Sequence, residues 1–230
     1  MILRTDPFMG YYESAMVECA NAIRLDPSEF GAYVDMARSL SALGRPQEAI
    51  YYFSQSLIIS PWVPQTHYYF GLESLKVGQM DRAISEFREA TRLAPTWPNA
   101  RVQLAVSLAT QGAMRDAVLE YQNALRFQPD SLIALNNLAW ILATYRDETL
   151  RCGKEAVRLA TRPCELTSWK QTIVIGTLAA AYAEAGDFDK AVAASEKACE
   201  LAVALGETNL LALNRDLLRQ FKNREPCRAN

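Results

Sequence analysis

The chain has 230 residues, half of them hydrophobic, and its 26 acidic and 24 basic residues give a formal net charge of -2. A balance this even supplies no global field that would attract nucleic acid or an anionic membrane. The first ten residues include charges and a proline, and no other stretch is apolar for long enough to cross a bilayer. We therefore predict no signal peptide, no membrane contact and no nucleic-acid partner.

Four segments of the chain align on one another without gaps: 10–27, 44–61, 78–95 and 112–129. Each begins with glycine, has alanine five residues later, and ends with proline twelve residues after that alanine. The stretches between them carry apolar residues at helical spacing. Glycine accommodates the left-handed conformation that closes a helix, and proline cannot continue one. Each 34-residue unit is therefore predicted to contain two amphipathic helices, the first ending at glycine and the second before proline.

The start of the array is incomplete. Residues 1–9 are too few, and too interrupted by Pro7, to form a full first helix before Gly10. Either the array is truncated there or the chain begins in the middle of a repeat of a longer parent protein. An exposed half-repeat is also a surface through which two copies of the chain could pair, so a homo-oligomer formed through the N-terminal end is one expectation.

The fifth unit breaks the register. Its marker alanine, Ala156, follows Ala117 by 39 residues rather than 34, which places a five-residue insertion within TYRDETLRCG. Pro163 therefore falls inside the second helix of this unit, although it lies 34 residues after Pro129. Proline there removes a backbone donor and crowds the carbonyl of Leu159, at a cost of about 3 kcal/mol. We predict a kink or an early end of this helix near Arg162.

The chain closes with a regular sixth unit and one further amphipathic segment. The sixth unit lacks the final proline, so its second helix is expected to run on toward Leu205. The segment NLLALNRDLLRQF is predicted to cap the open end of the array. The domain organisation is thus a single array over 1–230, with units at 1–29 (incomplete), 30–63, 64–97, 98–131, 132–171 (with the insertion) and 172–206, a capping helix at 207–222 and a tail at 223–230.

The recurring glycine, alanine and proline at a period of 34 residues resemble the tetratricopeptide repeat. The resemblance covers nearly the whole chain. It implies an all-α fold, a right-handed α-solenoid of antiparallel helix pairs with a C-terminal capping helix. It also implies that the first helices line a concave groove that binds peptides or other proteins. Small residues mark where the paired helices approach closely, among them Ala37, Gly71 and Ala105 on first helices and Ala49, Ala83 and Ala117 on second helices.

If the first helices line a groove, helical spacing turns eight candidate peptide-binding residues inward: Arg38, Gln65, Tyr69, Asn99, Gln103, Asn137, Trp140 and Thr177. Amide side chains both donate and accept, which suits an extended peptide backbone. Tyrosine and tryptophan are typical of binding hot spots. Two alternatives stay open: Trp140 packs between helices, and the amides either face water or, for Asn136, satisfy a neighbouring backbone group.

Some tetratricopeptide proteins grip a terminal carboxylate with a clamp of lysines, arginines and asparagines. The inward positions of this chain include only two basic residues, Arg38 and Lys76, so we do not expect a carboxylate clamp. Glu73, Glu86 and Glu89 have arginines nearby on helix faces, a pattern typical of ordinary surface pairing.

Candidate reactive residues are sparse. The five cysteines are scattered and never form a C-x-x-C pair, which argues against a zinc site and a disulfide framework. Reduced thiols indicate a reducing compartment, so we expect a cytoplasmic location, or a periplasmic one if the parent protein is membrane-anchored. His67 is the only histidine, and nothing around it resembles a catalytic triad. We predict a packed or solvent-edge role for His67, no catalytic residue, no metal and no cofactor.

Two functions fit these observations. The first is a non-catalytic scaffold that holds a peptide or protein segment in the groove. The second is an accessory or substrate-recruiting domain of a larger bacterial enzyme, such as a membrane-embedded glycosyltransferase, because residues 135–202 resemble the closing segment of bacterial tetratricopeptide proteins that carry such a portion upstream. A reading frame that continues upstream of Met1 into membrane spans would favour the second.

Overall fold

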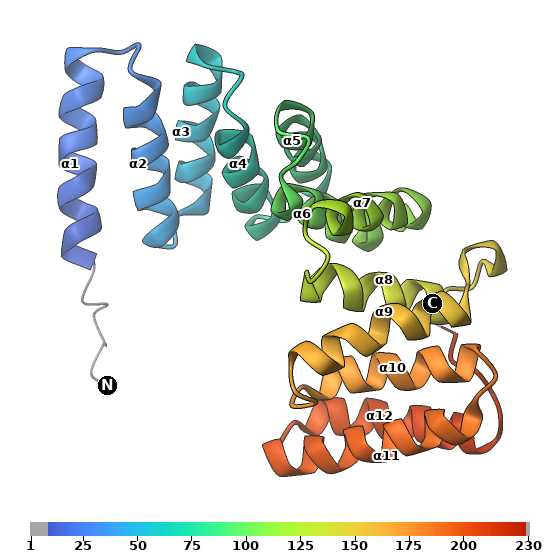
Figure 1. Ribbon diagram of the computed structural model, residues 1–230. Helices are drawn as coiled ribbons and strands as arrows, with labels where there is room; N and C mark the ends of the chain where they lie inside the picture. The colour runs from blue at the N-terminus through green and yellow to red at the C-terminus, as the bar shows by residue number, and fades with distance from the viewer. Residues whose placement is uncertain (1–8, 229–230) are drawn as a thin grey trace. The chain divides into compact units, whose positions relative to one another are not determined.

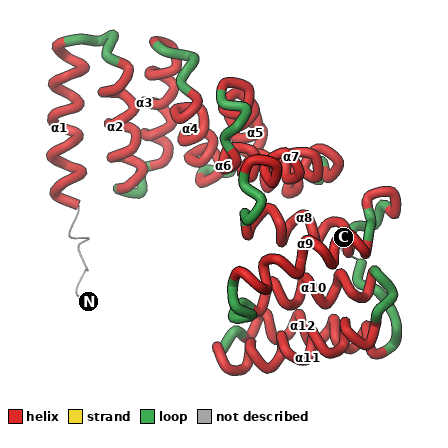
Figure 2. Tube along the Cα trace, in the orientation of Figure 1, coloured by secondary structure: helices red, strands yellow, loops and turns green. Residues whose placement is uncertain are grey.

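The computed structural model describes residues 9–228, which form twelve α-helices and one short 3-10 helix and contain no β-strand (Figures 1 and 2). The predicted all-α fold of paired helices is confirmed. The chain divides into two compact units, a first unit (Met1–Gly112) and a second unit (Ala113–Asn230), each much larger than a 34-residue unit of the repeat. Within residues 9–228, no helix has both the length and the apolar character needed to cross a membrane.

The first unit is a row of helices, each packed against the next one in the chain (Figure 1). Its elements are α1 (Met9–Leu25), α2 (Phe30–Ala42), α3 (Pro46–Ile59), α4 (Pro64–Lys76), α5 (Met80–Leu93) and α6 (Pro98–Thr110).

The second unit has the same pairing and adds a final helix. Its elements are α7 (Met114–Phe127), α8 (Leu132–Thr144), the 3-10 helix η1 (Glu148–Leu150), α9 (Gly153–Leu166), α10 (Thr172–Glu184), α11 (Phe188–Leu205) and α12 (Thr208–Lys222). Helix α10 packs against α8 and α12 as well as against its neighbours α9 and α11. The first helices α8 and α10 and the final helix α12 therefore lie in one layer, and α9 and α11 form the layer behind it.

The recurring glycines and prolines of the sequence explain most helix ends. Helices α1, α3, α5 and α7 each end two residues before one of the recurring prolines, at Pro27, Pro61, Pro95 and Pro129. The glycines after α2, α4, α6 and α10 all have positive φ angles, between 71° and 89°. At Gly44 the backbone N–H groups of Gly44 and Arg45 donate to the carbonyls of Ser41 and Leu40, which satisfies two carbonyls that the helix end would leave open.

Gly10 does not follow this pattern. It lies in the first turn of α1 and not after a helix. Residues 1–8, which with Met9 are predicted to be too few for a full first helix, lie outside the described residues.

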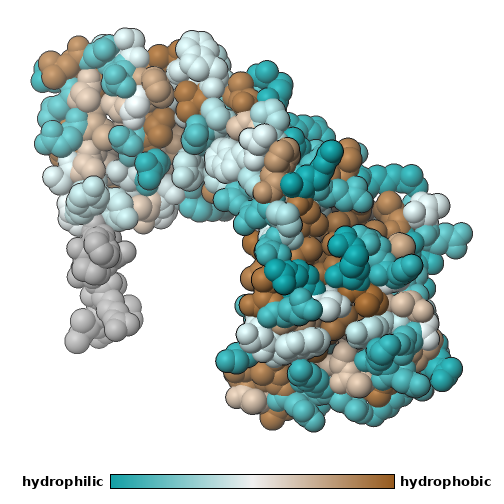
Figure 3. Space-filling view, in the orientation of Figure 1, coloured by the Kyte–Doolittle hydropathy of each residue, from teal (hydrophilic) through white to brown (hydrophobic). Residues whose placement is uncertain are grey.

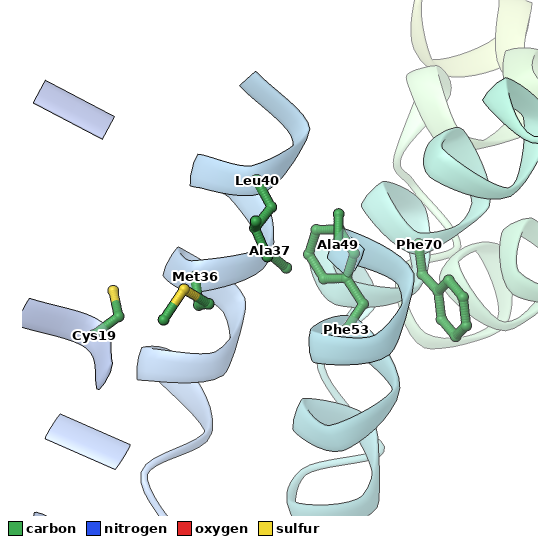
Figure 4. Packing of buried hydrophobic residues seen from close by; sticks show 7 residues of the cluster. All are labelled: Cys19, Met36, Ala37, Leu40, Ala49, Phe53 and Phe70. Carbon is green, nitrogen blue, oxygen red and sulfur yellow. The ribbon is translucent and has the colours of Figure 1, made fainter. Parts of the chain in front are cut away.

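Small residues allow the helices of a pair to approach, and aromatic rings fill the space beside them. Figure 4 shows this in the first unit, where Ala37 of α2 and Ala49 of α3 lie next to the ring of Phe53. Both alanines are fully buried. Gly71 shows how tight the contact becomes, because a Cβ added there would lie 2.6 Å from the ring of Phe87. Burial of this apolar surface is the main stabilising contribution to such a repeat.

Helix α9 continues through Pro163 to Leu166, so the predicted early end near Arg162 is wrong. Proline inside a helix removes a backbone donor and crowds the carbonyl four residues earlier, at a cost of about 3 kcal/mol. The ring of Pro163 is fully buried, and the thiol of the next residue, Cys164, donates to the carbonyl of Val174 in α10 at 3.5 Å. Packing between α9 and α10 thus outweighs the local preference against proline.

The loop between α8 and α9 is longer than the corresponding loops. It spans residues 145–152, whereas only residues 185–187 separate α10 from α11. Asp147 organises this loop by accepting hydrogen bonds from the backbone N–H and the hydroxyl of Thr149 and from Arg115. These bonds, those from Thr149 first, lower the pKa of Asp147 to about 2.

Candidate functional site

The face formed by α8, α10 and α12 in the second unit contains a pocket of about 200 Å³. Helix α8 contributes Asn136, Asn137 and Trp140; α10 contributes Ile173, Gly176 and Thr177; and α12 contributes Leu210, Leu213, Asn214 and Leu217. The structure thus brings together three residues that the sequence places in the groove, Asn137, Trp140 and Thr177. It adds a wall, α12, that the sequence analysis treats only as a cap.

The polar groups of α8 and α10 in this pocket are partly engaged within the protein. The side-chain Nδ2 of Asn137 donates to the hydroxyl of Tyr121, a buried residue of α7, at 3.1 Å. Burial raises the pKa of Tyr121, so this hydroxyl is neutral. The hydroxyl of Thr177 donates to the carbonyl of Ile173 on its own helix at 3.1 Å, and Thr177 is itself buried. Asn137 and Thr177 therefore shape the pocket as well as line it.

Two amide oxygens beside the pocket have no partner in the described structure: Oδ1 of Asn136 and Oδ1 of Asn214. Asn214 is 1% exposed, and its Nδ2 donates to the carbonyl of Leu210 at 2.8 Å. The Nδ2 of Asn136 makes only a long contact of 3.4 Å with Oδ1 of Asn137. Buried acceptors without donors are uncommon in native proteins and call for an explanation.

The first unit has a wider groove of about 750 Å³ between α1, α2 and α4. Here the structure brings Arg38 and Tyr69 together: the guanidinium carbon of Arg38 lies 5.8 Å from the centre of the Tyr69 ring. Arg38 also forms a loose ion pair of 3.8 Å with Asp35. Three carboxylates, Glu18, Asp35 and Glu73, line the groove together with Tyr11 and Tyr12. Its character is acidic and aromatic.

The remaining predicted residues do not join either site. Gln65 on α4 and Asn99 on α6 are exposed, and Gln103 on α6 is half-buried. None of them lines the two cavities described above. On its visible face, the surface of the protein mixes hydrophobic and hydrophilic residues (Figure 3).

Two potentially reactive side chains, Cys164 and His67, are buried in packed positions. Cys164 is fully buried, and burial raises the pKa of its thiol to about 12, which leaves it protonated. His67 is buried against Glu86 and is a packed residue, one of the two roles predicted for it. Among the described residues, no three His, Cys, Asp or Glu side chains gather in a way that could hold a metal ion.

The residue that sequence analysis missed is Asn214. It interrupts the apolar face of α12, four residues after Leu210 and three before Leu217. A polar residue at the core spacing of an amphipathic helix is the signal that could have identified it.

Paired helices with a groove on the first-helix face define this protein as a helical-repeat protein. Residues 174–202, which cover most of α10 and most of α11, match the family model of the tetratricopeptide repeat. The chain therefore contains a tetratricopeptide repeat, and its fold is that of tetratricopeptide solenoids.

Solved structures of tetratricopeptide proteins share this fold at low sequence identity. YrrB is 17% identical over 86% of this chain and 97% of its own, with a TM-score of 0.73. MamA from Desulfovibrio magneticus is 17% identical over 76% of this chain and 96% of its own, with a TM-score of 0.66. A tetratricopeptide protein from Thermus thermophilus is 21% identical over 82% of this chain and 98% of its own, with a TM-score of 0.54. No curated protein matches the chain in sequence.

Proposed function

We propose that this protein is a non-catalytic scaffold that holds a peptide or protein segment against the first-helix faces of its repeats. The tetratricopeptide fold commonly serves protein–protein interaction, and YrrB is described as having an unusual peptide-binding site. The observation that carries the proposal is the pocket between α8, α10 and α12, in which Asn137, Trp140 and Thr177 meet.

The form of this pocket supports binding. Its walls are mainly apolar, with a few convergent amide groups, which is the usual make-up of a ligand site. The helices that form it are fixed by packing with α9 and α11. A segment that binds here therefore meets a surface that is already ordered, and the entropic cost of forming the site is met when the protein folds.

In the first unit we propose that a bound segment contacts Arg38 and Tyr69 in the acidic groove, and Gln65, Asn99 and Gln103 on the neighbouring surface of α4 and α6. The groove is lined by three carboxylates and only one cation, Arg38, so it disfavours a terminal carboxylate, and the segment enters as an internal stretch and not as a chain end. This agrees with the small number of basic residues at inward positions.

The test is a selection of peptides from a random displayed library on the intact 230-residue chain. Each selected peptide is then titrated in solution by fluorescence anisotropy. Trp140→Ala removes a large part of the pocket wall, and we expect it to weaken binding by about tenfold or more, as is typical of a hot-spot residue. Trp62→Ala is the matched control, because Trp62 is 67% exposed and lies outside the pocket.

Equal affinities for the wild type, Trp140→Ala and Trp62→Ala would show that the peptide does not bind in the pocket between α8, α10 and α12. A library that yields no binding peptide would contradict the proposed function itself.

A further inference from the structure

We propose that the pocket between α8, α10 and α12 is a receptor for one aromatic side chain that carries a hydrogen-bond donor, tyrosine or tryptophan. The identification of this side chain as part of a partner protein rests on the proposed function. The preference for a donor-bearing ring rests on the pocket alone.

The size and lining of the pocket favour an aromatic ring as its occupant. Its volume is about 200 Å³ and its walls include Trp140, Ile173 and Leu213. An apolar protein cavity of roughly 150 Å³ is large enough to bind benzene. A small polar side chain would leave most of this apolar volume unfilled, and a lysine or arginine would enter a pocket whose lining includes no carboxylate to pair with it.

The first acceptor that favours a ring with a hydrogen-bond donor is Oδ1 of Asn214, which is buried without a partner. The carbonyl of Leu210 can only accept a hydrogen bond, so the side-chain atom that lies 2.8 Å from it is the nitrogen of Asn214. The oxygen therefore points away from the backbone of α12 and toward α10. There it is the atom nearest to the position that a Cβ on Gly176 would take, at 2.6 Å. The absence of a side chain at Gly176 thus leaves room for this oxygen beside the pocket.

A second acceptor lies on the opposite wall. Oδ1 of Asn136 is buried and has no partner in the described structure, and Asn136 belongs to α8. The pocket is therefore bordered by two acceptors from two helices and by apolar side chains. Phenylalanine or leucine would fill the space and leave both acceptors without a donor, whereas the hydroxyl of tyrosine or the indole N–H of tryptophan would satisfy one of them.

The test uses small aromatic probes, so no partner needs to be known. Indole and 1-methylindole have nearly the same ring but differ in the N–H donor, and 4-methylphenol and 4-methylanisole differ in the O–H donor. Each probe is titrated into the intact chain labelled with 15N, and the indole N–H signal of Trp140 reports binding. We expect the donor-bearing member of each pair to bind about tenfold more tightly than its methylated partner, since the methylated probe leaves a buried acceptor unmet.

The variant Asn214→Leu removes one acceptor and replaces the amide with a branched apolar side chain that has the same number of heavy atoms. We expect it to reduce the tenfold preference to about twofold while both probes still bind. If this variant unfolds, Gly176→Ala provides a second test, because its methyl group displaces the Asn214 oxygen and should reduce the same preference. Trp62→Ala should leave the preference unchanged.

Equal affinities for the two members of each pair in the wild type, or a Trp140 signal that does not move, would overturn the inference. Probes that bind with the expected preference in a chain that selects no peptide would keep the pocket assignment and reject the proposed function. Peptides that bind through Trp140 while the probes show no preference would support the proposed function and overturn the inference that the pocket prefers a donor-bearing ring.

Discussion

His67 and Glu86 join α4 to α5 through a hydrogen bond of 2.7 Å between Nδ1 of the histidine and Oε2 of the glutamate. The other ring nitrogen, Nε2, lies 2.9 Å from the carbonyl oxygen of Pro61. A carboxylate and a carbonyl both accept, so both nitrogens donate and the imidazole is the cation. The side chain of Glu86 is 17% exposed, so the expectation of ordinary surface pairing is wrong for this residue.

This contact makes the stability of the first unit depend on pH. Burial is the largest influence on the pKa of His67 and lowers it, but the hydrogen bonds to Glu86 and Pro61 and the charges of Glu86 and Glu89 together raise it above its ordinary value. The protonated histidine therefore stabilises the folded chain fully below the unfolded pKa of about 6.5, and the contribution is lost as the pH rises through the folded pKa.

We expect urea unfolding of the wild type to show a free energy of unfolding that falls between about pH 6 and pH 9, relative to His67→Gln, which cannot titrate. Glu86→Ala should cost about 2 kcal/mol at pH 6, since a charged hydrogen bond is lost, and less at pH 9. Parallel pH profiles for the wild type and His67→Gln would show that folding does not raise the pKa of His67.

The contact of Gly71 with Phe87 predicts a destabilising Gly71→Ala substitution. Alanine is the better helix former by about 1 kcal/mol, but its Cβ would lie 2.6 Å from the Phe87 ring, and overpacking of a core costs about 1–3 kcal/mol. We expect a net loss of about 1 kcal/mol in the free energy of unfolding. Gly10→Ala is the control, since Gly10 is also helical and no atom lies within 4 Å of its added Cβ. A stabilised Gly71→Ala protein would show that the helix pair relaxes freely.

Pro163→Ala tests whether packing offsets the cost of proline within α9. Alanine restores an N–H donor to the carbonyl of Leu159 and removes a cost of about 3 kcal/mol. It also removes two buried methylene groups, at about 0.8 kcal/mol each, and makes the unfolded chain more flexible by about 0.4–1 kcal/mol. We expect a change below about 1 kcal/mol in thermal or urea unfolding. A gain near the full cost of a mid-helix proline would mean that the buried ring contributes little.

Much of the fold was predictable because the backbone preferences of glycine and proline mark where the helices of each repeat end. Positive φ angles at Gly44 and Gly78 and helix ends before Pro61 and Pro95 follow from local conformational preference alone. The predicted early end near Arg162 failed because burial of the Pro163 ring offsets the local cost of the proline, and one sequence does not show that burial. The division into six repeats stays a prediction.

The candidate site was only partly predictable. Helical spacing placed Asn137 and Trp140 on the groove face, and they do line one pocket. Spacing could not show that Asn137 also donates a hydrogen bond to the hydroxyl of Tyr121, because that contact joins α8 to another helix, α7. Nor could it show that α12 closes the pocket, since the sequence predicts only a capping role for this helix.

The most direct test of the proposed binding site is 19F NMR of the chain labelled with 5-fluorotryptophan, to which a library-selected peptide is added. The four tryptophans include natural controls. Trp97 packs on Tyr68, with ring centres 4.7 Å apart, Trp169 lies beneath the ammonium group of Lys197, and Trp62 is exposed. We predict that the Trp140 resonance shifts and saturates with the peptide while the resonances of Trp62, Trp97 and Trp169 stay in place. A bound peptide that leaves Trp140 unmoved would contradict the account.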